Sequence, residues 1–240
     1  MKETIYTIPL NEAFDEPCEC PLSLIESRLE KEAIEYTLGA AMMEPDFRIE
    51  SNSKGYCNKH FSMLNAQSNK LSLALVLDTH LEEIRAELKE VLKTVSGKGG
   101  IFKKKANPEK LIEFLKKKES SCIVCDKIEH TMKRYIDIML DMWKEEADFK
   151  KKLENSKGMC LPHYKKVVLT AQKKLSNSAE FIDMLTQKQL TELERIQEDI
   201  HKFTLKFDYR NKDMQWGTAK DAPIRTIEKI SGDVLKFELK

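Results

Sequence analysis

The sequence predicts an all-α protein made of two tandem repeated helical modules that form a bundle, with a short C-terminal tail. Three observations carry this prediction. Only eight glycines and seven prolines interrupt the 240 residues, which is about half the usual share of each. Apolar residues recur at helical spacing over long segments. A nine-residue motif containing cysteine and histidine occurs twice, so each module is expected to carry its own Cys3His metal site.

The first module covers residues 1–95 and is expected to be mainly helical. Only Ile5–Leu10 alternates weakly, as a short strand would. The strongest helical signal is the segment 71–95, where leucine, isoleucine and valine recur at steps of three, four and six to seven residues. This spacing gives one apolar stripe along a helix. Residues 96–106 hold three of the eight glycines and are predicted to be a Gly/Lys-rich linker.

The second module covers residues 107–207, and a tail follows over 208–240. Asn107-Pro108 is typical of a helix start with proline in the first turn, and Ile128–Trp143 continues a helical stripe. Asn177 followed by Glu180 predicts a new helix from Ser178. In the tail, Gly232 predicts the end of a short helix over 222–231, and residues 234–239 alternate weakly like a strand.

Each module contains the motif N-S-K-G-x-C-x-x-H. It occupies Asn52–His60 and again Asn155–His163, 103 positions later. A close cysteine pair precedes each copy, namely Cys18 with Cys20 and Cys122 with Cys125. All six cysteines therefore fall inside the duplication, which indicates that they serve one repeated purpose.

That purpose is predicted to be metal binding. A cysteine and a histidine three residues apart at a helix start lie on one face and can hold one ion, and the cysteine pair adds two thiolates. Three sulfurs and one imidazole suit tetrahedral zinc. The ligands of the first ion are predicted to be Cys18, Cys20, Cys57 and His60. Those of the second are predicted to be Cys122, Cys125, Cys160 and His163. Exchange of the pairs between modules is left open.

Two zinc ions with four protein ligands each leave no open coordination position, so we expect the metal to be structural. No catalytic motif is recognised, and an enzyme is not favoured. Three alternatives stay open: a thiol-based redox sensor, an iron–sulfur cluster with one histidine ligand, and buried reduced cysteines that act as small apolar residues.

The tail offers a second candidate site. The aromatic and polar residues of 208–225 could line the pocket of a small-ligand binder or an enzyme, or a partner groove, or they could anchor the tail on the helices. The candidates are Tyr209, Arg210, Asn211, Trp216, Asp221 and Arg225.

Composition narrows the partners and the compartment. Lysine plus arginine number 41 against 40 acidic residues, for a net charge of +1, which removes the global electrostatic argument for nucleic acid. The eight lysines within residues 98–118 are expected to be a solvated surface. No segment reaches the roughly 20 apolar residues of a membrane span, and no signal-peptide core is found. We therefore expect a cytoplasmic protein with a protein partner, and the oligomeric state is left open.

The two Gly-x-Cys-x-x-His stretches, the cysteine pairs and the Phe207–Asn211 segment resemble an uncharacterised bacterial family, a domain of unknown function found mainly in anaerobic Gram-positive bacteria. The resemblance covers nearly the whole chain. It implies a bacterial cytosolic protein and assigns no activity or catalytic residue. An anaerobic habit favours an oxygen-sensitive thiolate or iron–sulfur site slightly more than composition alone does.

Overall fold

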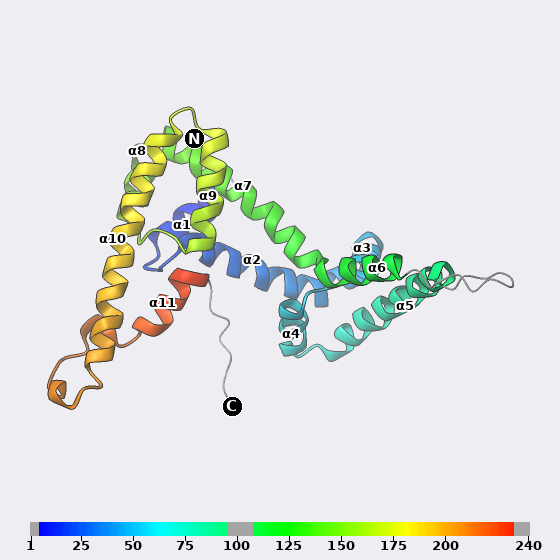
Figure 1. The fold of residues 1–240 in the computed structure, drawn as a ribbon. Coiled ribbons are helices and arrows are strands. Elements are labelled where there is room, and N and C mark those ends of the chain that lie inside the picture. The colour runs from blue at the N-terminus through cyan, green and yellow to red at the C-terminus, as the bar shows by residue number, and fades with distance from the viewer. Residues whose placement is uncertain (1–4, 96–107, 233–240) are drawn as a thin grey trace. The chain divides into compact units, whose positions relative to one another are not determined.

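A computed structural model describes residues 5–95 and 108–232 (Figure 1). These residues fold into α-helices and short 3-10 turns, with no strand among them, so the all-α prediction is confirmed. The α-helices are α1 (Thr7–Asp15), α2 (Pro21–Leu38), α3 (Pro45–Lys54), α4 (Asn58–Ala66), α5 (Lys70–Val95), α6 (Glu109–Ser120), α7 (Ile123–Glu145), α8 (Ala147–Asn155), α9 (Leu161–Lys174), α10 (Ser178–Leu205) and α11 (Ala222–Ser231). None of the described helices combines the length and apolarity needed to cross a bilayer.

The chain forms two compact units. The middle unit is residues 29–130, and the terminal unit combines residues 1–28 with 131–240. Helices α2 and α7 each begin in one unit and end in the other. These units do not coincide with the modules predicted over 1–95 and 107–207. The predicted linker at 96–106 lies outside the described residues.

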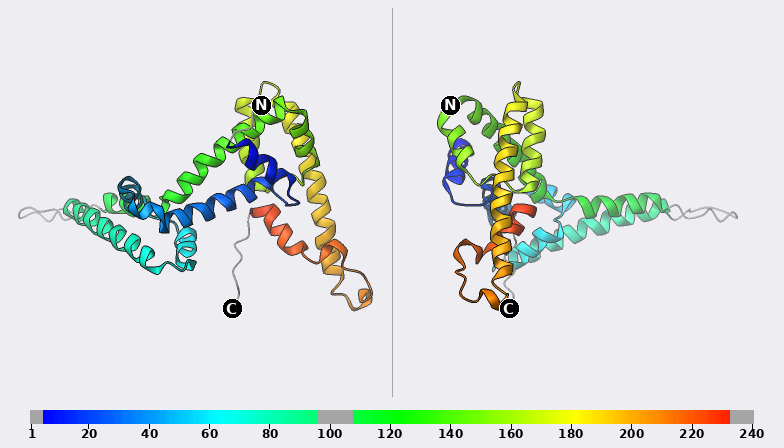
Figure 2. Two further views of the ribbon diagram at one scale, coloured as in Figure 1. Left: turned by 180° about the vertical axis from the view of Figure 1, so that it is seen from behind. Right: turned by 60° about the vertical axis from the view of Figure 1, so that its left-hand side comes forward.

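The middle unit has a small core. Helices α5 and α6 run side by side in it (Figures 1 and 2), and α3 packs against α5. The predicted stripe on α5 is largely exposed, because Leu71, Leu81 and Leu88 face outward, while Leu73 and Val76 form the buried side. An apolar stripe alone therefore did not identify the face that meets the core.

The terminal unit has a larger core. Helices α9 and α10 lie side by side (Figure 2), and α11 packs against both. Phe149 and Phe181 are fully buried, and the Trp143 ring meets the Phe181 ring edge to face at 4.7 Å. Of the twelve largest fully buried side chains among the described residues, ten belong to this unit and two to the middle unit. The two units therefore differ in how much stability apolar burial can supply.

Two predicted helix ends in the second half of the chain agree with the structure, whereas α6 starts at Glu109 with Pro108 as its N-cap and not in its first turn. Helix α10 starts at Ser178, and α11 ends at Ser231, directly before Gly232, whose φ of 95° favours glycine. The N-terminal strand prediction is wrong, because α1 begins at Thr7 and buries Leu10 and Phe14 on one helical face. Six residues were too few to distinguish the two periods. The strand predicted at 234–239 lies outside the described residues.

Candidate metal centres

The middle unit brings three cysteines and one histidine together. The ligand atoms of Cys57, His60, Cys122 and Cys125 all lie within 4.8 Å of one another. Cys57 is the N-cap of α4, and His60 lies in that helix's first turn. Cys122 and Cys125 stand at the start of α7. Two helix starts therefore face each other through their donor atoms.

The distances in this group fit tetrahedral coordination. Zn–S bonds of about 2.3 Å and a Zn–N bond of about 2.0 Å place two sulfurs about 3.8 Å apart, and a sulfur and a nitrogen about 3.5 Å apart. The Sγ atoms of Cys57 and Cys125 are 3.8 Å apart. His60 Nδ1 lies 3.2 Å from the Cys57 and Cys122 sulfurs and 3.4 Å from the Cys125 sulfur. The residues therefore fit one zinc-sized ion.

The outer nitrogen of His60 faces a carboxylate. His60 Nε2 lies 3.4 Å from Glu30 Oε1, and Lys59 also pairs with Glu30. Although burial raises the pKa of Glu30, its contacts with His60 and Lys59 leave that pKa below its usual value. A carboxylate behind a ligating histidine fixes the ring orientation and strengthens the donor nitrogen.

The side chains of the group shift one another's pKa values. Burial lowers the pKa of His60, but the contacts with Cys122 and Glu30 outweigh it and raise this pKa to about 10. Burial raises the pKa of Cys122, but the hydrogen bond with His60 brings it down to about 6. Burial and the neighbouring sulfurs raise the pKa of Cys125. The contact with His60 thus favours the ionised form of Cys122, whereas burial and the neighbouring sulfurs disfavour that of Cys125.

The loop before Cys57 needs a glycine. Gly55 has a φ of 70°, and an added Cβ would lie 2.6 Å from the His80 ring. His80 Nδ1 is held 2.7 Å from the Asn52 carbonyl oxygen. Lys118 Nζ donates to the Ser53 carbonyl at 2.7 Å, and Ile123 N donates to the Gly55 carbonyl at 3.1 Å. These contacts join the loop to the start of α7, which carries the other ligands.

The terminal unit holds a related group, formed by Cys20, Cys160 and His163. His163 Nδ1 lies 3.1 Å from the Cys160 sulfur and 3.6 Å from the Cys20 sulfur. His163 Nε2 faces Glu26 Oε2 at 3.5 Å, as His60 faces Glu30. The Cys20 side-chain contact lowers the pKa of Cys160 to about 4, with help from His163 and against burial.

Cys18 does not belong to this group. Its thiol points to the Ala13 carbonyl oxygen at 3.8 Å, and burial raises its pKa. Ser23 lies beside the donors instead, with its Oγ 3.4 Å from the Cys160 sulfur and 3.2 Å from His163 Nδ1. The prediction of four cysteine and histidine donors per ion therefore fails here, because a hydroxyl stands beside three donors.

The backbone shows which residues correspond. Ser23 N lies 3.4 Å from the Cys20 sulfur, and Cys125 N lies 3.5 Å from the Cys122 sulfur. Cys20 therefore corresponds to Cys122, and Ser23 to Cys125. Aligning the two cysteine pairs by sequence matches the wrong residues. The segment that corresponds to Cys122–Cys125 is Cys20–Ser23, a C-x-x-S that follows the C-x-C pair.

Each group combines a Gly-x-Cys-x-x-His loop from one repeat with a cysteine from the start of the other repeat's helix. The grouping predicted within each module is therefore wrong, and the exchanged arrangement is observed. Sequence could not decide between them, since both pairings use the same residue types. Packing decides, because the N-terminal end of α2 lies in the terminal unit and that of α7 in the middle unit.

The loop of the terminal group is held as tightly as its counterpart. Gly158 has a φ of 73°, and an added Cβ would lie 2.9 Å from the Gln189 amide oxygen. Gln189 accepts a hydrogen bond from Met159 N at 3.2 Å and donates one to Met159 O at 2.8 Å. Gln189 on α10 thus takes the role that His80 has on α5, and no sequence motif marked either residue.

A fully buried lysine clamps the two ligand segments of the terminal group. Lys229 Nζ donates to the Glu19 carbonyl at 2.9 Å and to the Lys157 carbonyl. Glu19 precedes the ligand Cys20, and Lys157 lies three residues before Cys160. Burial lowers the pKa of Lys229. Helix α11 therefore forms part of this site, although sequence analysis did not single out Lys229.

The tail candidates divide into two kinds. Arg225 enters a buried ion network, with its Nη2 2.9 Å from Asp199 Oδ2 and its Nη1 3.7 Å from Glu19 Oε1, and Asp221 pairs with it from an exposed position. Tyr209 is 77% exposed. The others make local contacts: Arg210 with Asp208, Trp216 with the Phe203 and Phe207 rings, and Asn211 with the Leu205 carbonyl. A ligand role for these residues stays a prediction.

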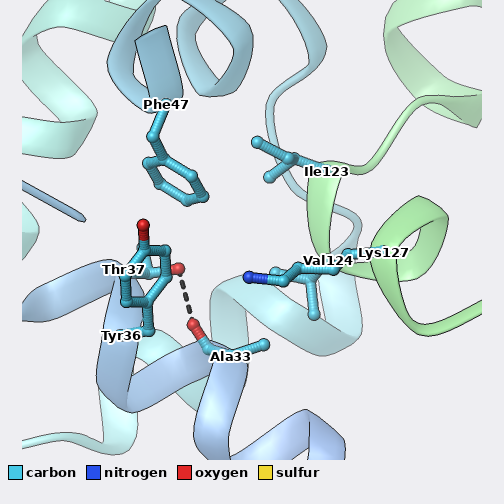
Figure 3. Close-up of a pocket in the computed structure, with 7 residues that line it drawn as sticks. All are labelled: Ala33, Tyr36, Thr37, Phe47, Ile123, Val124 and Lys127. Atoms are coloured by element: carbon cyan, nitrogen blue, oxygen red, sulfur yellow. Dashed lines mark hydrogen bonds between the residues drawn. The ribbon is translucent and has the colours of Figure 1, made fainter. Parts of the chain in front are cut away.

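A small hollow adjoins the Cys122–Cys125 turn in the middle unit (Figure 3). Its cavity volume is about 10 Å³, far below the roughly 300 Å³ of a small-molecule pocket. The Lys127 ammonium lies 4.5 Å from the centre of the Tyr36 ring. The other lining residues are Ala33, Thr37, Phe47, Ile123 and Val124. We interpret the hollow as a packing feature between α2, α3 and α7.

A comparison with protein-family models matches residues 1–236 to a family of unknown function, DUF6062. The chain belongs to this family. The match confirms the resemblance inferred from the cysteine motifs, and it covers both donor groups and the tail helix. No curated protein and no solved structure matches the chain.

Proposed function

We propose that this protein is a cytoplasmic, zinc-stabilised helical binding protein that holds two structural ions. The observation that carries the proposal is the Cys57–His60–Cys122–Cys125 group, whose four donor atoms all lie within 4.8 Å of one another. Four protein ligands leave no position for a reacting water. Each ion would join a helix start to a loop from the other repeat and so fix the hairpins of its unit.

Metal analysis tests this proposal. Protein purified without oxygen should contain close to two zinc ions per chain and show no visible absorbance. Complete chelation should lower the helical circular dichroism, because binding energy of about 10–16 kcal/mol per structural zinc is coupled to folding. A metal-free chain with full helicity and unchanged stability would refute the proposal. Iron together with visible absorbance would show that the protein holds an iron–sulfur cluster instead of zinc.

We propose that the partner is a protein. Helix α5 presents Leu81, Leu88 and Leu92 to solvent, and their spacing places them on one side of the helix. Exposed apolar patches of this kind are typical of interaction sites. Replacing Leu88 and Leu92 by lysine should abolish partner binding and leave the metal content unchanged. Loss of metal in that variant would instead assign the leucines to folding.

A thiol redox sensor is the second candidate. Cys125 is exposed, and its sulfur lies 3.8 Å from that of Cys57. Hydrogen peroxide could oxidise the two thiolates to a disulfide, with the peroxide taking up two protons from solvent to give two waters and the ion released. Peroxide treatment should then yield a Cys57–Cys125 disulfide and free zinc in parallel, and Cys125→Ser should prevent the disulfide. Zinc that stays bound under peroxide would exclude this role.

A further inference from the structure

The two donor groups are built alike but differ at one position. In both groups, a loop cysteine and histidine meet a cysteine at a helix start, and a glutamate lies behind the histidine. The residue three positions after the helix-start cysteine is Cys125 in the middle unit and Ser23 in the terminal unit. The terminal group thus has two cysteine sulfurs where the middle group has three.

Ser23 lies where a fourth ligand would be. A tetrahedral zinc ion with an oxygen ligand at about 2.0 Å places that oxygen about 3.5 Å from a ligating sulfur and about 3.3 Å from a ligating nitrogen. The observed separations of Ser23 Oγ are 3.4 Å from Cys160 Sγ and 3.2 Å from His163 Nδ1. The helix start thus aims a hydroxyl at the position that a thiolate fills in the other unit.

We infer that the terminal group binds zinc as a Cys2His site with the Ser23 hydroxyl in the fourth position, and that it is the weaker of two unequal metal centres. This inference rests on the proposed function. A neutral hydroxyl is a poorer ligand for zinc than a thiolate, and the formal charge of the loaded group is zero instead of −1. Even an outer-shell partner is worth about 10–100-fold in metal affinity, so we expect a difference at least that large.

Because the two donor groups differ in burial, the order in which they release zinc to a chelator can differ from the order of their zinc affinities. Cys20, Cys160 and His163 are all buried, whereas Cys125 is exposed. A chelator could therefore reach the stronger middle site sooner than the weaker terminal one. The test must be an equilibrium competition, in which the zinc-loaded full chain is titrated with a chromophoric chelator until no further change occurs.

The wild-type protein should give up its two ions in two separate steps, with one ion per chain in each. Ser23→Cys completes the third thiolate and should raise the affinity of the weak step toward that of the strong one. Cys125→Ser makes the reciprocal change and should weaken the strong step. In cobalt-loaded protein, Ser23→Cys should increase the sulfur-to-metal charge-transfer absorption, and Cys125→Ser should decrease it.

Cys18 provides the decisive control. Cys18→Ser should leave both steps and the cobalt spectrum unchanged, because this thiol faces the Ala13 carbonyl. A weaker site and a reduced charge-transfer band in Cys18→Ser would show that Cys18 is the fourth ligand and overturn the inference. Two ions of equal affinity, with no effect of Ser23→Cys, would overturn it as well. Protein without any metal would refute the proposed function itself.

Discussion

The two units differ in what stabilises them, namely metal ligands in one and buried side chains in the other. The middle unit has three cysteine sulfurs in its donor group but only two of the twelve largest fully buried side chains among the described residues. The terminal unit has two cysteine sulfurs and the other ten, of which all but Lys229 are apolar. Apolar burial supplies about 25 cal/mol per Å², so the terminal unit depends less on its ion. The comparison indicates that a unit with a large apolar core tolerates a weaker metal site.

The largest expected effect follows in the middle unit. Cys122→Ser removes a buried ligand, and the unit should lose its ion and unfold, because the roughly 10–16 kcal/mol of zinc binding is comparable to the 5–15 kcal/mol that stabilises a domain. Hydrogen exchange should show lost protection in α3–α5 and retained protection in α8–α10. Cys18→Ser is the matched control and should keep both ions. Intact protection of α3–α5 in Cys122→Ser would contradict this comparison.

The second effect concerns the terminal unit. Lys229→Met should lower its free energy of unfolding by about 3 kcal/mol, because two hydrogen bonds from a charged donor to backbone carbonyls are lost inside the protein. Urea unfolding of the zinc-loaded chain measures the change, and the exposed Lys220→Met serves as control. If both variants unfold at the same urea concentration, the buried clamp contributes nothing.

Helices and donor residues were predictable from the sequence because both leave periodic or duplicated signals. The apolar stripe over 71–95 and the repeated motif around Cys57 and Cys160 can both be recognised in the sequence alone. The pairing of loops with helix starts left no such signal. Either cysteine pair satisfies either loop chemically, and only the packing of α2 and α7 selects one arrangement.

The supporting residues were hidden for other reasons. Ser23 was not predicted as a ligand because Cys18, two residues before Cys20, was the more obvious second donor. Lys229 is one of many lysines, and its burial depends on where α11 packs. The buried side of α10 includes Gln189 and Asp199, so a search for apolar periodicity could not find the residues that hold the site.

The third effect separates two arginines of the tail. Arg225→Gln should destabilise the terminal unit by about 2 kcal/mol, because its hydrogen bond to the buried Asp199 is charge-assisted. Arg210→Gln should have no measurable effect, since Arg210 pairs with Asp208 at the exposed surface. Thermal unfolding of the two variants side by side provides the measurement. Equal losses would mean that burial does not distinguish the two pairs.

The smallest effect is the pH dependence of the Asp199 pair. Burial raises the pKa of Asp199, but its contacts with Thr218 and Arg225 outweigh burial and lower it. A carboxyl with a lowered pKa in the folded state adds stability above its unfolded pKa of about 4, and this stability disappears as the pH falls through the folded pKa. The destabilisation caused by Asp199→Asn should therefore be constant from pH 7 to 5 and shrink from pH 4 to 3. Urea unfolding of both proteins across this range measures the difference, which also cancels any loss of metal common to both. A difference that grows in acid would mean that Asp199 is protonated more readily in the folded protein, and the ion network would then not stabilise the tail.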